Sequence, residues 1–327
     1  MKAIQFTFAT ICLTVTFLAA TGCNNNQAPA TPASSSTTEV VNTTTKSSFE
    51  RVIKHVAGET ILKEAPRNIA ILDYSYIDYL TALEMKPGST VSFVDNELPP
   101  YLSEQVQADE ITFLGPIGGV NPEKVLAADP DLIIGTSPGQ EKIYDQLSKI
   151  SNTILLSQSA FDWRHTLNEF ANIIGKEDKA IQLIANYDEK MKASAELVKA
   201  TIGNESVLFL RVLEKDYRVY GKVSPAGSVL YNDLALKAPE GVPMDKKLQV
   251  ISIEVMPELN PDHIFLLVQE DAEEKMGELQ NNPLWKNINA VKNNRIYPVD
   301  QRLWIQGEGP IASSIMLDQA VKELTKK

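Results

Sequence analysis

The chain is poor in cysteine, and both of its cysteines stand near the N-terminus. Cys12 and Cys23 are the only two among 327 residues, and they precede the part of the chain that can build a hydrophobic core. A folded region without cysteine has no disulfide, no thiolate metal site and no cysteine nucleophile. Cysteine-dependent enzymes are therefore excluded for that region.

Histidine is also scarce. His55, His165 and His263 are far apart in the sequence and lack the clustered spacing of a zinc or manganese site. We therefore expect no metal bound directly by side chains and no resident cofactor. Haem is disfavoured by the same shortage, although a tyrosine could serve as its ligand.

Basic residues are outnumbered by acidic ones. The chain has 31 Lys and Arg against 42 Asp and Glu, which gives a net charge of −11. An acidic chain lacks the broad basic face that binds nucleic acid, so no nucleic-acid partner is expected. A local basic pocket remains compatible with this balance.

Residues 1–22 have the features of a leader peptide, with one lysine followed by a long apolar stretch. The stretch ends in Thr-Gly-Cys at Cys23, which resembles a bacterial lipobox. The resemblance implies cleavage before Cys23 and lipid attachment to it, and so a lipid-anchored protein on the extracytoplasmic face of the cell membrane. The usual motif has Leu where this chain has Ala20, and an ordinary secretory signal is the alternative.

Residues 23–48 are nearly all Asn, Ser, Thr, Ala and Pro. Such a composition cannot bury enough apolar surface to fold, so it predicts a disordered tether between the lipid and the folded region.

One stretch without Gly or Pro predicts a long helix. Residues 176–202 place apolar side chains at steps of three and four, with charged residues on the other face. Such a helix is about 40 Å long. It separates residues 49–175 from residues 203–327, so we predict two lobes joined by a single long rigid α-helix. A stiff connection predicts only small movement of the lobes when a ligand binds.

Short β-type segments alternate with helical ones on both sides of this helix, beginning with Ile69–Leu72 and Val207–Leu213. This alternation predicts an α/β fold with two Rossmann-like lobes, each with a parallel sheet covered by helices. An internal repeat supports the division. Glu123 precedes a Pro130-Asp131 pair at the same interval at which Glu254 precedes Pro261-Asp262, and an apolar strand follows each pair.

These two Glu…Pro-Asp blocks, together with Pro66-Arg67-Asn68 and the segments NPLW at 282–285 and AVKN at 290–293, carry a family likeness. They resemble the iron-siderophore and vitamin B12 type of substrate-binding protein from ABC importers, over residues 50–327. The resemblance implies two Rossmann-like lobes bridged by one rigid helix, with the ligand in the cleft between them. It also implies a monomer that is a lipoprotein in Gram-positive bacteria, partnered by a permease and its ATPase. By position, Glu123 and Glu254 would dock on arginines of the permease.

The ligand is expected beyond the carboxyl ends of the strands. Arg211 interrupts an apolar strand, where a guanidinium is costly unless it meets an anion. Arg218 and Tyr220 alternate on one face of the next strand, and Arg302 lies in a loop before the last helix. The predicted ligand-binding residues are Tyr74, Trp163, Arg211, Arg218, Tyr220, Arg302 and Trp304.

This cationic and aromatic set suits an anionic ferric siderophore of the carboxylate or citrate/hydroxamate type, with iron bound only through its chelator. For each arginine a structural salt bridge is the alternative, and for each aromatic ring plain core packing. A haem- or corrinoid-binding protein of the same fold is the alternative function.

A serine hydrolase is a remote second alternative. Residues 135–139 match the G-x-S-x-G pattern around Ser137, but Pro138 lacks the N–H that the oxyanion hole of such an enzyme requires. Its catalytic base would have to be His165 or His263.

Overall fold

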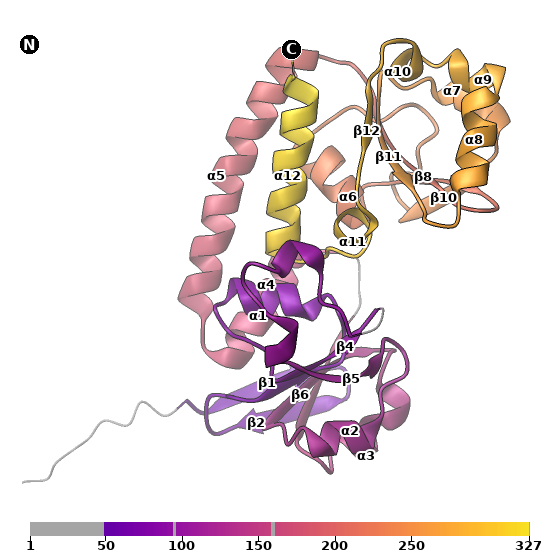
Figure 1. Cartoon of the computed structure of the whole chain (residues 1–327). Coiled ribbons are helices and arrows are strands. Elements are labelled where there is room, and N and C mark those ends of the chain that lie inside the picture. The colour runs from indigo at the N-terminus through magenta and orange to yellow at the C-terminus, as the bar shows by residue number, and fades with distance from the viewer. Residues whose placement is uncertain (1–48, 94–95, 158–160, 327) are drawn as a thin grey trace, which may run out of the picture. The chain divides into compact units, whose positions relative to one another are not determined.

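The computed structural model describes residues 49–93, 96–157 and 161–326. They form two α/β lobes connected by helix α5 (Glu177–Ile202), as Figure 1 shows. The predicted fold class is therefore confirmed. The expected leader, the lipidated Cys23 and the tether lie outside the described residues. Within the described part of the chain, no helix is long and apolar enough to cross a membrane.

The N-terminal lobe holds a five-stranded parallel sheet in the order β5-β4-β3-β6-β7. Its strands are β3 (Ile69–Ile71), β4 (Ser89–Ser92), β5 (Thr112–Pro116), β6 (Leu132–Ser137) and β7 (Asn152–Ser157). Its helical segments are α1 (Tyr76–Ala82), η1 (Pro100–Leu102), η2 (Ala108–Glu110), α2 (Pro122–Ala127), η3 (Glu141–Ile143), α3 (Tyr144–Leu147) and α4 (Trp163–Ile174). A hairpin of β1 (Arg51–His55) and β2 (Gly58–Leu62) precedes the sheet.

Alternating side chains of this sheet enter two separate cores. Ile69 and Ile71 belong to the main core, whereas Ala70 and Leu72 pack with Val125 and Leu147 in a smaller cluster. This alternation follows from the two-residue period of a strand, and burial on both faces explains why the strands are almost wholly apolar.

The C-terminal lobe holds a second five-stranded sheet in the order β10-β9-β8-β11-β12. Its strands are β8 (Val207–Val212), β9 (Tyr217–Tyr220), β10 (Leu248–Ile251), β11 (His263–Val268) and β12 (Ile296–Pro298). Its helical segments are α6 (Pro225–Gly227), η4 (Ser228–Asp233), η5 (Ile253–Val255), α7 (Met256–Leu259), α8 (Glu273–Asn281), α9 (Pro283–Lys286), α10 (Asn289–Lys292), α11 (Gln301–Trp304) and α12 (Pro310–Thr325).

This second sheet is mixed, so the prediction of a parallel sheet in each lobe is wrong for the C-terminal lobe. Strand β9 runs antiparallel to both β8 and β10, while β8, β11 and β12 are parallel. The link from β8 to β9 has only the four residues 213–216. A parallel crossover needs a dozen or more residues, and a link of this length therefore allows only an antiparallel hairpin.

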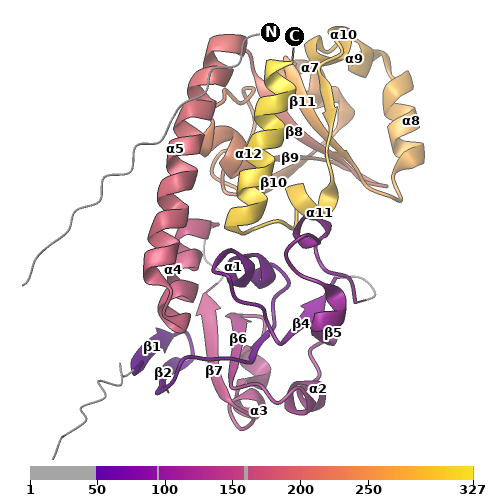
Figure 2. The same ribbon diagram turned by 60° about the vertical axis from the view of Figure 1, so that its left-hand side comes forward.

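Helix α5 packs one face against the rest of the protein, as its periodicity predicted. Ala180, Tyr187 and Val198 are buried, and Ile184 and Met191 pack partly buried against the same core. Helix α12 lies beside α5 (Figures 1 and 2) and also contacts α1 and α4 of the N-terminal lobe. The last helix therefore takes part in joining the lobes.

The repeated Pro-Asp pairs have the same structural role in both lobes. The Asp131 carboxylate accepts hydrogen bonds from the backbone N–H groups of Arg67 and Asn68, just before β3. The Asp262 carboxylate accepts from the backbone N–H and the hydroxyl of Ser206, just before β8. Each aspartate thus fixes the start of the central strand of its sheet.

Candidate ligand-binding site

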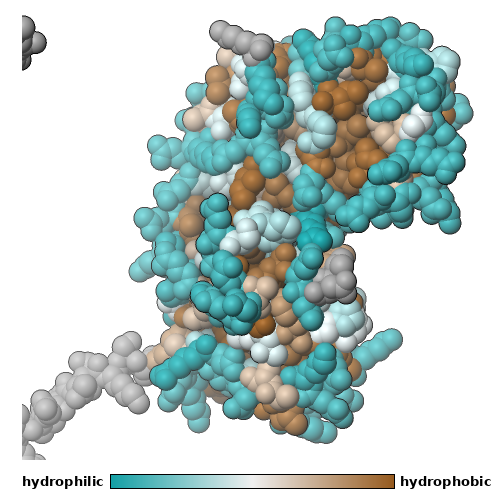
Figure 3. All heavy atoms as spheres, in the orientation of Figure 1, coloured by the Kyte–Doolittle hydropathy of each residue, from teal (hydrophilic) through white to brown (hydrophobic). Residues whose placement is uncertain are grey.

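The parallel strands of the N-terminal sheet, and β8, β11 and β12 of the second sheet, end toward the region between the lobes (Figure 1), where the surface is hollowed (Figure 3). On the N-terminal side the connection after β3 carries Tyr74, whose ring is buried and meets Phe93 edge-on at 5.4 Å between ring centres. Phe93 follows β4 and is 43% exposed. Burial raises the pKa of Tyr74 to about 12, so its hydroxyl remains a neutral hydrogen-bond donor.

Arg302 and Glu97 form an ion pair between the lobes. Arg302 lies in α11 and Glu97 in the connection between β4 and η1, and their charged atoms are 2.5 Å apart. The hydrogen bond from this guanidinium to Glu97 raises the pKa of Arg302. Tyr74 lies near enough to Arg302 for the guanidinium to oppose the rise in the tyrosine pKa. These three side chains bring the two lobes together at one side of the cleft.

Arg211 is the fifth residue of β8 and is half-buried. Its guanidinium donates to the Gln269 side chain and, at 3.4 Å, to the Tyr220 hydroxyl. Its Nε is buried without a hydrogen-bond partner among the described residues. A buried N–H without an acceptor is costly. Because Arg211 as a whole is only partly buried, its guanidinium can still meet an anion or a polar ligand oxygen.

Arg218 lies directly opposite Arg211 in the β8–β9 ladder. Two like charges at opposed positions repel each other. The carboxylate of Asp216 reduces this repulsion, because it accepts hydrogen bonds from Nε of Arg218 at 2.9 Å and from its Nη2 at 3.2 Å. Tyr220, two residues further along, shares this face of the sheet.

Both predicted tryptophans lie inside the protein. Trp304 is fully buried, stacks on Phe265 and donates from its indole N–H to the side chain of Gln319 at 2.8 Å. Phe209 packs between Trp304 and Tyr220. Trp304 therefore packs inside the protein on the same face of the sheet as Arg211 and Tyr220, and its buried ring is not presented to the cleft.

Trp163 is 2% exposed and belongs to a cluster at the connection of the lobes. Its ring meets Tyr187 of α5 edge-on, and the Arg164 guanidinium lies over both rings. Arg164 pairs with Asp188 of α5 and approaches Asp233 of the C-terminal lobe to 3.6 Å. Trp163 thus contributes to the interface that holds the lobes on α5.

A cavity of about 520 Å³ lies between the lobes next to Trp163 in the chain, and none of the seven predicted ligand-binding side chains lines it. Ser75, Tyr76 and His165 line it from the N-terminal lobe, and Lys247 and Glu308 from the C-terminal lobe. Lys247 is 3.8 Å from Glu308, and burial raises the pKa of Glu308 to about 7. The cavity is therefore lined by a basic and an acidic side chain.

The sequence prediction missed three of the charged or polar groups at this site: Glu97, Gln269 and Lys247. Gln269 directly follows β11, so the rule that placed the other residues at strand ends could have found it. Glu97 and Lys247 lie in irregular segments, where no periodic pattern indicates which way a side chain points.

The groups considered for a hydrolase have other partners. The Ser137 hydroxyl donates to Glu141. His263 is hydrogen-bonded through one ring nitrogen to Glu205 at 2.8 Å and through the other to Tyr297 at 2.9 Å. His165 approaches Glu169. Among the described residues, no group of His, Cys, Asp and Glu side chains is arranged to hold a metal ion.

The two glutamates of the repeated blocks are exposed at matching places. Glu123 is in the first turn of α2, after Asn121, whose side chain accepts from the Glu123 backbone N–H. Glu254 is in η5, and a hydrogen bond from Ser252 lowers the pKa of its carboxyl. Both side chains are exposed to solvent.

Comparison with known proteins places these features in context. The family described as "Periplasmic binding protein" matches residues 69–303. The iron-uptake system-binding protein of Bacillus subtilis is 29% identical over 75% of this chain and 77% of its own. The probable siderophore-binding lipoprotein YfiY of the same organism is 30% identical over 90% and 91%. Staphylococcus aureus SirA complexed with staphyloferrin B superposes with a TM-score of 0.73 at 27% identity, over 84% of this chain and 98% of SirA.

Proposed function

Because the chain belongs to the periplasmic binding protein family, we propose that it captures a ferric siderophore between its lobes and delivers it to an ABC importer. The names of the relatives support this substrate, since they include an iron-uptake and a siderophore-binding protein. Iron enters the site only inside its chelate, and the chain acts as a binding protein and not as an enzyme. We propose that it works as a monomer.

Arg211 carries the argument for an anionic ligand. Its Nε is buried without an acceptor in the described part of the chain, and Arg218 lies directly opposite it. Two neighbouring guanidinium groups are stabilised when a carboxylate or a deprotonated hydroxamate reaches them, because arginine binds such oxygens in pairs. This arrangement favours a siderophore of the carboxylate or citrate/hydroxamate type.

We assign direct ligand contact to Tyr74, Arg211, Arg218 and Arg302, with Phe93 as an exposed ring beside them. Tyr220 holds Arg211 through its hydroxyl. Trp163 and Trp304 support the site from the core, and their fluorescence serves as a reporter of binding.

The test is a fluorescence titration with ferric citrate, a ferric hydroxamate, a ferric catecholate and haem. The wild-type protein is expected to bind a citrate or hydroxamate chelate. Arg211→Ala is expected to lose about tenfold or more in affinity, because a hydrogen bond to a charged group contributes about 1.5–3 kcal/mol. Arg295→Ala is the matched control, since Arg295 pairs with Glu205 away from the cleft. Haem binding with a Soret band, or no binding of any ferric chelate, would overturn the proposal.

Glu123 and Glu254 are proposed to dock on arginines of the permease. Both lie exposed on equivalent short helical segments of the two lobes. Reversing both charges with Glu123→Lys and Glu254→Lys is expected to abolish iron uptake by cells while the affinity in solution stays unchanged. Glu59→Lys, at an exposed position in the hairpin, is the control. Normal uptake by the double variant would refute the docking role.

The proposed anchor is a lipid on Cys23, which would hold the protein on the extracytoplasmic face of the cell membrane. Cys23→Ser is expected to release the protein into the medium or leave its leader uncleaved. Membrane retention of a cleaved Ser variant would rule out this anchor.

A further inference from the structure

A buried carboxylate of the N-terminal lobe accepts hydrogen bonds from the C-terminal lobe. Asp78 lies in α1 of the N-terminal lobe and has no exposed surface. Its two carboxylate oxygens accept hydrogen bonds from the backbone N–H groups of Ile311 and Ala312, each at 2.9 Å. Those two residues form the first turn of α12 in the C-terminal lobe. Asp78 therefore caps a helix that belongs to the other lobe.

The surrounding residues allow this close approach. The residue before α12 is Gly309, where an added Cβ would stand 2.2 Å from the Asp78 carboxyl group. The neighbouring Tyr79 donates from its hydroxyl to the backbone carbonyl of Glu308 at 2.6 Å. Residues 308–312 are thus held at three backbone atoms by two consecutive side chains of α1.

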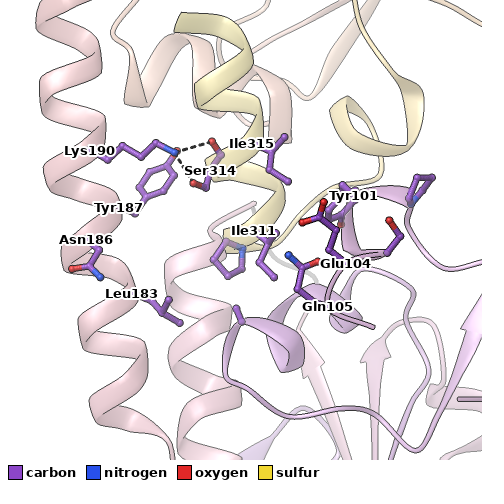
Figure 4. A pocket seen from close by; sticks show the side chains of 14 residues that line it. Tyr101, Glu104, Gln105, Leu183, Asn186, Tyr187, Lys190, Ile311, Ser314 and Ile315 are labelled. Atoms are coloured by element: carbon purple, nitrogen blue, oxygen red, sulfur yellow. Dashed lines mark hydrogen bonds between the residues drawn. The ribbon is translucent and has the colours of Figure 1, made fainter. Parts of the chain in front are cut away.

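Apolar packing beside this contact is incomplete. A cavity of about 640 Å³ opens between the N-terminal lobe, α5 and the first turns of α12, as Figure 4 shows. Tyr101 and Gln105 line it on one side, Leu183 on another, and Ile311 and Ile315 on the third. On the side of this cavity, the polar bonds from Asp78 and Tyr79 hold the start of α12 to the N-terminal lobe.

The capped segment is continuous with the ligand-binding loop. Helix α11 carries Arg302, and the N–H of Gly307 donates back to Leu303 within the same short stretch. On the other lobe, Tyr74 precedes Asp78 by four residues. The segment that carries Tyr74 and Asp78 therefore meets the segment that carries Arg302 and the start of α12 at two places. Tyr74 lies near Arg302, and Asp78 binds α12.

From this geometry we propose that Asp78 is a positioning residue: its cross-lobe cap on α12 fixes the distance between Tyr74 and Arg302 and so sets the affinity of the cleft. The effect on affinity rests on the proposed function, but the cap itself does not. The two claims therefore need separate measurements.

Hydrogen exchange of individual amides tests the cap without a ligand. Asp78→Ala is expected to speed exchange at Ile311 and Ala312 by about fivefold or more, as the loss of a helix cap allows. Asp78→Asn retains one carbonyl oxygen, so only one of the two amides should stay protected. Gly309→Ala, with Asp78 in place, should speed exchange at both amides by displacing the carboxylate.

Asp262→Asn is the matched control, because Asp262 joins two segments of a single lobe. It should leave exchange at Ile311 and Ala312 unchanged. Unchanged exchange in Asp78→Ala and in Gly309→Ala, or equal acceleration throughout both lobes, would overturn the proposal.

The affinity measurement then follows with ferric citrate and a ferric hydroxamate. Asp78→Ala is expected to weaken binding about tenfold although the side chain touches no ligand, and Asp78→Asn to weaken it less. If the wild-type protein binds no ferric chelate, the proposed function fails while the exchange result still decides the cap. If exchange quickens and the affinity is unchanged, Asp78 joins the lobes without positioning the site, and the inference is wrong.

Discussion

Arg302 meets Glu97 across the cleft, so an anionic ligand that approaches the guanidinium competes with this carboxylate. Both side chains are partly exposed, so the pair itself contributes little to stability. The ion pair is expected to affect ligand affinity instead, because a ligand that approaches Arg302 competes with Glu97. If Arg302 binds the ligand as proposed, Glu97 favours ligands with stronger or multiple negative groups.

Glu97→Gln is expected to tighten the binding of ferric citrate by about three- to tenfold, because removing the competing charge is worth roughly 1 kcal/mol. Arg302→Ala should weaken binding. A titration at low and high salt checks both effects, and the gain from Glu97→Gln should shrink at high salt. Unchanged affinity in both variants would place the ligand away from Arg302.

The carboxyl group of Asp78 has an unusual balance of forces. Burial raises its pKa to about 7 from an ordinary 3.8, against the lowering effect of the N–H groups of Ile311 and Ala312 and of Tyr101. Folding therefore takes up a proton between these two pKa values. The resulting stabilisation is complete below about pH 4 and is lost as the pH rises through 7.

The wild type and Asp78→Asn should differ in how their free energies of unfolding depend on pH. The difference, wild type minus variant, should fall by about 2–3 kcal/mol between pH 5 and pH 8. Urea unfolding at several pH values measures this difference. Glu308, whose pKa is also raised to about 7, is present in both proteins, so its contribution cancels. A difference that does not change with pH would mean that Asp78 is not buried as a titrating acid.

At the scale of secondary structure, the Pro-Asp turns fix the two sheets. Asp262 accepts hydrogen bonds from Ser206 and from the side-chain amide of Asn289. Burial by itself would raise the pKa of Asp262, but these hydrogen bonds outweigh it and lower that pKa. Asp131 makes the equivalent bonds to the segment before β3. The internal repeat in the sequence therefore marks two equivalent restraints on strand position.

Asp131→Ala and Asp262→Ala are each expected to lower the free energy of unfolding by about 1–3 kcal/mol, because each leaves backbone N–H groups without their acceptor. Ligand affinity should stay close to that of the wild type, since both residues lie at the amino ends of the strands. Chemical denaturation with parallel ligand titrations checks this. Lost affinity at unchanged stability would contradict it.

At the scale of the whole folded region, α5 connects the lobes along the chain and α12 adds packing contacts between them. Helix α12 packs along α5, and Lys190 of α5 donates to the Ser314 hydroxyl at 2.9 Å and to Asp318 at 2.6 Å. Asp78 holds the first turn of α12 to the N-terminal lobe. This paired connection is stiffer than a single helix and opposes wide hinge motion.

We therefore expect small-angle X-ray scattering to give nearly the same radius of gyration for the free protein and for the protein saturated with a ferric siderophore. The chelator without iron is the control. A large decrease on loading would show that the lobes close by a hinge motion and that the paired helices bend.

The sequence by itself determined the local features. The spacing of apolar residues predicted which face of α5 is buried. Apolar segments that end in polar residues predicted the positions of the strands in both lobes. The composition of the chain excluded cysteine chemistry. Arg211 stood out because a charge inside an apolar strand is costly wherever the strand lies. Each of these inferences depends only on neighbours along the chain.

Only the tertiary structure decided which distant groups meet. It placed Trp163 and Trp304 in the core, paired Arg302 with Glu97, and brought Asp78 to the start of α12. These contacts depend on how two lobes pack on α5 and α12, and no period or local spacing encodes that packing. An aromatic ring satisfies the same sequence pattern whether it lines a cleft or fills a core, so burial had to be seen in the folded protein.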